Sequence, residues 1–195
     1  MCWSAEGSLA TWALGMILAT YAKIHATAHP AIWFLGLEFT QMQLIEYFLW
    51  KNLNNPEQNA LWSRAGMWLI LAQPYFSIWT IQNLQLRRTL WALYSGAIIL
   101  FLNSEKRDYS TEVGGNGHLK WNFLFERGSW FNIVWALGLL APLVYSGHTE
   151  VFWFGSLTAL VSLYFNSKYK TTGSYWCWLV VFGWLGALVK TGGRL

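Results

Sequence analysis

The charged residues of this chain fall in clusters, and the stretches between the clusters are long and apolar. One of these stretches runs from Ala65 to Leu86 without a single charge. An apolar stretch of about 20 residues is long enough to cross a bilayer as a helix. Only 11% of the 195 residues are charged and 55% are hydrophobic, whereas about 25% of the residues of an average soluble protein are charged. The sequence therefore predicts an all-α polytopic membrane protein.

Seven transmembrane helices are expected, in a single domain that covers residues 1–195. Their predicted bounds are 3–22, 30–50, 62–86, 89–104, 128–147, 150–167 and 173–190. Fifteen Trp, nine Tyr and twelve Phe fit this prediction, because amphipathic aromatic side chains settle at the level of the lipid headgroups. The long polar connection at 105–127 contains a Gly-rich run, 114–117, which is interpreted as a flexible turn.

An odd number of spans places the two termini on opposite sides of the membrane. Eight Lys and Arg residues then lie on the side of the N-terminus and five on the other side. Because cytoplasmic loops carry an excess of Lys and Arg, this count favours a cytoplasmic N-terminus. The net charge of +4 comes from residues that flank the apolar segments, which is typical of lipid anchors, so no nucleic-acid partner is expected. The expected partners are the lipid bilayer and further copies of the chain.

The second apolar segment carries the residues that are least favourable inside a membrane. Glu38, Gln41, Gln43 and Glu46 all lie in the run that ends at Trp50. A carboxylate at membrane depth costs several kcal/mol unless a protein interior or a wet cavity compensates it. On a helix, Gln43, Glu46 and Trp50 share one face, while Glu38 and Gln41 begin a neighbouring stripe. The sequence therefore predicts a polar seam that faces the other helices.

The first functional hypothesis is transport, or channel-type movement, of a proton, an ion or a small solute along this seam. Gln73 precedes a proline in the third segment, and Ser174 opens the last one. The predicted pathway consists of Glu38, Gln41, Gln43, Glu46, Gln73 and Ser174. The alternative for the polar residues is structural, because amides and carboxyls also hold membrane helices together by hydrogen bonds.

A second set of residues falls on the N-terminal side of the membrane in this topology: Cys2, Glu46, His118 and Cys177. Thiolate, imidazole and carboxylate groups are the usual ligands of zinc and copper. The four residues lack the short spacing of known zinc motifs, so a surface histidine and two small apolar cysteines are the structural alternative. The second hypothesis is a membrane-embedded redox or metal-binding enzyme, with Zn, Cu or a tetrapyrrole as its cofactor.

The third hypothesis is a scaffold or an accessory subunit of a larger membrane complex. Aromatic belts and small-residue helix faces are sufficient for such a role. Gly155, Ser156 and Thr158 give the sixth segment a face of this kind. The residues alone leave the three hypotheses open, and with them the question of whether the protein is an enzyme.

Three short stretches carry a resemblance to a known family. The chain opens with Met1-Cys2-Trp3-Ser4-Ala5, the second segment contains Gln-Leu-Ile-Glu-Tyr-Phe-Leu-Trp at 43–50, and the last opens with Gly-Ser-Tyr-Trp-Cys at 173–177. These stretches are similar to the M-C-x-S-A, Q-x-x-E-x-x-x-W and G-S-x-W-C motifs of uncharacterised small multi-span membrane proteins from bacteria and from giant viruses of algae.

The resemblance extends over the whole chain through short motifs. His-Leu-Lys-Trp at 118–121 resembles a loop of the viral members, whereas Tyr47 stands where the bacterial members usually have Gly. The resemblance implies a seven-span fold and supplies no mechanism. The residues that it highlights are Cys2, Ser4, Gln43, Glu46, Ser174 and Cys177.

Overall fold

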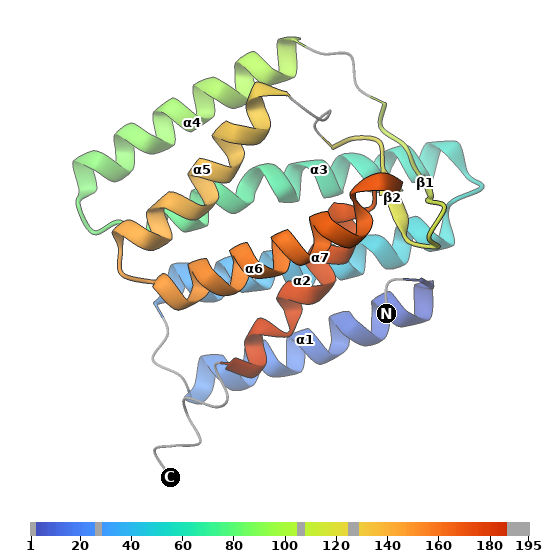
Figure 1. Cartoon of the computed structure of the whole chain (residues 1–195), viewed down its shortest axis with the longest axis horizontal. Coiled ribbons are helices and arrows are strands. Elements are labelled where there is room, and N and C mark those ends of the chain that lie inside the picture. The colour runs from blue at the N-terminus through green and yellow to red at the C-terminus, as the bar shows by residue number, and fades with distance from the viewer. Residues whose placement is uncertain (1–2, 26–28, 105–107, 125–128, 187–195) are drawn as a thin grey trace.

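The computed structural model describes residues 3–25, 29–104, 108–124 and 129–186, and Figure 1 shows them as a helical bundle. Seven α-helices make up most of the described chain, which confirms the predicted all-α class and the number of helices. The helices are α1 (Ala5–His25), α2 (Pro30–Lys51), α3 (Pro56–Trp79), α4 (Leu84–Ser104), α5 (Trp130–Tyr145), α6 (Thr149–Asn166) and α7 (Thr172–Val181). A short 3-10 helix, η1 (Ser167–Tyr169), joins α6 to α7.

The helices in the region of the third and fourth predicted spans have other bounds than the charges suggested, because capping residues decide where α3 and α4 begin. The Asn55 side chain accepts a hydrogen bond from the backbone N–H of Gln58 (3.2 Å), so α3 begins at Pro56 instead of residue 62. α3 ends at Trp79, and the Asn83 side chain caps the next helix by accepting a hydrogen bond from the backbone N–H of Leu86 (3.0 Å). The predicted boundary between spans three and four, at 86–89, therefore lies inside α4.

The helices were also predicted to cross a membrane. Among the described residues, no helix is both long enough and apolar enough to count as a candidate membrane span. Membrane crossing therefore stays a prediction. The last predicted span, 173–190, extends beyond residue 186 and so lies partly outside the described residues.

Successive helices run in alternating directions along the bundle (Figure 1). α2 is the central helix, and it packs against α1, α3 and α7. α1 and α7 both begin at the end of the bundle where α2 finishes, and they run in the opposite direction to α2 (Figure 1). This end is called the hairpin end, because a β-hairpin of β1 (Thr111–Val113) and β2 (Leu119–Trp121) lies there.

The β-hairpin is held in place by side-chain hydrogen bonds. The amide group of Asn59 in α3 donates to the carbonyl oxygen of Thr111 (2.9 Å) and accepts from its backbone N–H (2.8 Å). At the turn, Asn116 donates to the side chains of Asn166 (2.8 Å) and Thr171 (2.9 Å). The predicted flexible turn is therefore the tip of an ordered hairpin that is tied to α3 and to the connection between α6 and α7.

Three helices approach each other closely at Gly15 of α1. A Cβ atom at this position would lie 2.7 Å from Cγ2 of Thr40 in α2 and 3.0 Å from Cγ1 of Val181 in α7. Both distances are shorter than ordinary van der Waals contacts. Gly96 of α4 provides a contrast, since a Cβ atom there would meet no atom within 4 Å. The absence of a side chain at Gly15 therefore allows α1, α2 and α7 to pack together.

The contrast between the two glycines gives a matched pair of variants. We expect Gly15→Ala to lower the stability by about 1–3 kcal/mol, because the added methyl group overpacks the junction. Gly96→Ala should raise the stability by up to about 1 kcal/mol, because alanine is the better helix former in open space. Thermal unfolding of the purified variants, followed by circular dichroism, measures both effects. Equal shifts in the two variants would contradict the close approach at Gly15.

Candidate functional site

The polar residues predicted on the second segment are buried in α2. Gln43 and Glu46 are each 0% exposed, and Glu38 is 8% exposed. They are buried because α2 is surrounded by α1, α3 and α7, so few of its positions reach the outer surface. A buried carboxyl group is expensive unless polar groups or charges compensate it. The buried polar residues of α2 are therefore the candidate functional site.

Glu46 faces α7. Its carboxyl group lies within electrostatic reach of the Cys177 thiol, which is 2% exposed. Phe39, which lies seven residues before Glu46 on the same face of α2, contacts the ring of Trp176 edge-on, with 5.3 Å between the ring centroids. Ser174, in the first turn of α7, is 1% exposed. Glu46, Ser174 and Cys177 thus belong to one region between α2 and α7.

Glu38 faces α3 and α4 instead. Its carboxyl group lies within electrostatic reach of the Tyr94 hydroxyl, which donates a hydrogen bond to the backbone carbonyl of Leu71 (3.1 Å). Gln73 of α3 is also buried, at 1% exposure, and neither atom of its amide group has a partner among the described residues. The two carboxyl groups of α2 are therefore approached by different helices, and a pathway that uses both must bend around α2.

Gln41 does not face the polar seam. Its amide oxygen accepts a hydrogen bond from the indole N–H of Trp12 (3.3 Å), and its amide nitrogen lies 3.1 Å from the Met16 sulfur. Both partners belong to α1. Gln41 therefore joins α1 to α2, and the structure places it apart from the other predicted pathway residues.

His118 lies at the hairpin end and is 5% exposed. Its ring contacts the rings of Trp3 (centroids 4.8 Å apart) and Tyr175 (5.4 Å). Cys2, the fourth member of the predicted metal or thiol set, lies outside the described residues. Within residues 3–25, 29–104, 108–124 and 129–186, no three His, Cys, Asp or Glu side chains form a group that could hold a metal ion. The metal site stays a prediction without a ligand group to support it.

The structure draws attention to two serines in α1 and just before it, for which the sequence indicated no role. Ser4, which the family resemblance highlights, accepts a hydrogen bond from the backbone N–H of Gly7 (3.1 Å) and so caps α1. Ser8 is 0% exposed, although no motif singled it out. Its spacing of seven residues from Gly15 places both on one face of α1, and this spacing of two small residues is the signal that could have found it.

Comparison of the chain with family models, with curated proteins and with solved structures finds no match. The resemblance to small multi-span proteins therefore stays an expectation. The candidate site must be interpreted from its own chemistry, which consists of a carboxyl, an amide and hydroxyl groups enclosed by helices. Such groups bind protons, water and small polar species.

The buried imidazole of His118 predicts a pH-dependent stability. Burial lowers the pKa of His118, because the imidazolium loses its hydration. The unfolded chain therefore binds this proton at a higher pH, close to the ordinary value of about 6.5. Where the unfolded state holds more protons, stability falls as the pH is lowered. We expect the thermal midpoint to decrease as the pH falls through this range, and to decrease less in the His118→Gln variant.

The control for this measurement is His25→Gln. His25 is an exposed residue at the end of α1, where its ring contacts Tyr21. This variant should keep the pH dependence of the parent protein. If His118→Gln shows the same pH dependence as the parent, the buried imidazole is not its source.

Proposed function

We propose that the protein resides in a membrane, with the hairpin end on the cytoplasmic side, and moves a proton, an ion or a small solute past the buried polar residues of α2. One observation carries the proposal: large apolar side chains cover the outside of the bundle, while two carboxyl groups and several amides and hydroxyls are buried within its mostly apolar core. Water would instead select polar side chains for the outside. An apolar outside that encloses a few polar groups suits a protein surrounded by lipid.

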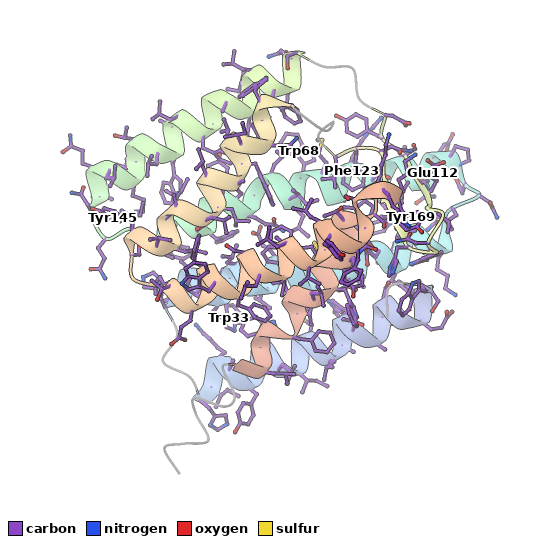
Figure 2. All side chains as sticks on the ribbon, in the orientation of Figure 1. Trp33, Trp68, Glu112, Phe123, Tyr145 and Tyr169 are labelled. Carbon is purple, nitrogen blue, oxygen red and sulfur yellow. The ribbon has the colours of Figure 1, made fainter. Side chains whose placement is uncertain are left out.

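The outside of the bundle supports the first half of the proposal. Large apolar side chains are exposed along α1, α4, α5 and α6, and Figure 2 shows such side chains standing out from these helices, including the labelled Tyr145. Examples are Leu93 (66% exposed), Ile99, Ile133, Leu137, Leu157, Leu160, Tyr164 (82%) and Phe165. A contiguous apolar surface on this scale marks contact with a membrane or with another protein.

The inside of the bundle supports the second half of the proposal, which is movement of a proton, an ion or a small solute past the polar residues of α2. The buried polar residues between the helices include Ser8, Glu38, Thr40, Gln43, Glu46, Gln73, Ser77 and Ser174. Hydroxyls and amides can serve helix packing alone, but a buried carboxyl is costly for stability and is retained where it does chemistry. A scaffold would need the apolar outside but would have no use for the two carboxyls. Transport therefore accounts for more of the structure than the scaffold hypothesis does.

Flux measurements with the protein in liposomes test the proposal. A proton-sensitive dye, a Na⁺ tracer and a K⁺ tracer should be followed in parallel across the pH range 5–8, a range of about three units around the ordinary histidine value. At least one flux should exceed that of empty liposomes. Glu46→Gln should reduce this flux by about tenfold or more, because it removes the titratable group while keeping its size.

Glu57→Gln is the matched control, because Glu57 is an exposed carboxyl in the first turn of α3. This variant should leave the flux unchanged. Equal flux in Glu46→Gln and the parent protein would remove Glu46 from the pathway. The absence of any flux above that of empty liposomes would refute transport of these ions.

A further inference from the structure

We infer that the transported species is a proton, and that Ser8, Ser174 and His118 hold ordered water molecules that connect Glu46 to the hairpin end. The inference rests on the proposed function and specifies its substrate. It is carried by two observations. Ser8, Glu46 and Ser174, on three neighbouring helices, lie at about one level of the bundle, and the hydroxyl groups of both serines are buried with no hydrogen-bond partner in the described part of the chain.

The meeting of the three helices follows from their register. Gly15, Thr40 and Val181 are in close contact, as described above. Seven residues along a helix correspond to two turns, or about 10 Å, and return to nearly the same face. Two turns toward the hairpin end lead from Gly15 to Ser8 and from Val181 to Ser174.

On α2, the same step of seven residues from Thr40 leads to Tyr47, and Glu46 precedes it by one residue. Glu46 follows Thr40 by six residues, and it faces α7, as its interaction with Cys177 shows. The ion pair of Glu6 in α1 with Lys51 in α2 (3.3 Å) joins these two helices close to the same level. Ser8, Glu46 and Ser174 therefore lie at one level between α1, α2 and α7. These three residues are called the serine node below.

The buried polar atoms around the serine node need hydrogen-bond partners that the described protein atoms do not supply. The hydroxyl groups of Ser8 and Ser174 are buried and have no hydrogen-bond partner among the described residues. The same holds for Nδ1 of His118 and for the indole N–H groups of Trp50 and Trp121. Buried polar groups in native proteins are almost always satisfied, and ordered water is the usual partner when no protein atom is available. Several such atoms at one end of the bundle favour a short chain of water molecules.

The charge balance at the node favours water over a metal cation. Ser8 and Ser174 lie in the first turns of α1 and α7, so both helix N-termini point their partial positive charges at this level. Each N-terminus contributes roughly half an elementary charge. Together they offset the charge of one carboxylate. A node that is close to neutral gives little attraction to Na⁺ or K⁺, whereas water and a transferred proton need no net negative charge.

His118 is placed to exchange protons between the node and the hairpin end. It touches Trp3, which precedes α1, and Tyr175 of α7, and Tyr175 is the neighbour of Ser174. Tyr175 is the titratable residue of α7 that contacts the His118 ring, while Glu112 and Lys120 of the hairpin pair with each other. Because burial lowers its pKa, the imidazole is neutral near pH 7 and can accept a proton.

The relay requires only proton transfers. A proton binds to Nδ1 of His118 from the hairpin end and then moves to a water molecule at the node as the N–H bond breaks. Each further step breaks one O–H bond and forms another, until the carboxylate of Glu46 is protonated. No electrons are exchanged, so no oxidant or reductant is needed.

Proton flux into liposomes in Na⁺-free choline buffer tests the inference, with a K⁺ gradient and valinomycin as the driving force. We expect Ser8→Ala combined with Ser174→Ala to reduce the flux about tenfold, because each change removes a hydrogen-bonding group of the relay. Ser174→Thr, which keeps a hydroxyl group, should retain most of the flux. His118→Gln should reduce the flux and remove its dependence on pH near neutrality. Flux of the parent protein should be slower in heavy water.

Ser77→Ala is the matched control. Its buried hydroxyl already donates to the carbonyl of Leu139 (2.5 Å), and it lies on α3 away from the serine node. Thermal unfolding identifies variants that fail to fold, and the heavy-water measurement on the parent protein does not depend on any variant. Flux of Na⁺ or K⁺ without protons would overturn the inference while transport stands, as would an unchanged proton flux in the double serine variant. The absence of every flux would overturn the proposed function and the inference with it.

Discussion

The burial of two carboxyl groups in one central helix is the constraint on which the rest of this structure depends. Glu38 and Glu46 lie on α2 with three helices packed around them. A carboxyl group that is removed from water destabilises the fold unless polar groups approach it. The Tyr94 hydroxyl lies near Glu38 but donates its hydrogen bond to the Leu71 carbonyl, and the Cys177 thiol lies near Glu46.

Close packing at Gly15 and the ordered hairpin enclose the same region from two sides. The missing side chain at Gly15 allows α1 and α7 to approach α2. The hairpin, tied to α3 by Asn59, brings His118 over the end of the bundle. Neither the close packing at Gly15 nor the hairpin encloses this region alone. Together they enclose the buried polar side chains near the hairpin end.

Sequence reasoning succeeded where the decisive interactions are local. The number of helices and their alternation along the chain followed from the length of the apolar stretches. It failed at Asn55 and Asn83, where a single capping hydrogen bond, rather than the nearest charge, sets the start of a helix. It also failed at Gln41, because a glutamine on a helix can bond to any neighbour, and its partner on α1 is not readable from α2 alone.

By itself, the sequence determined that the protein is a bundle of seven helices and that its second helix carries two carboxyls that must be enclosed. Apolar length and charge spacing act within one helix, so they can be read locally. Only the tertiary structure decided that Gly15, Thr40 and Val181 come into close contact and that Glu38 and Glu46 lie near different helices. The physical reason is that the inward face of each helix depends on all of its neighbours at once, and the close approach of α1 to α7 joins residues more than 100 positions apart, Gly15 and Val181.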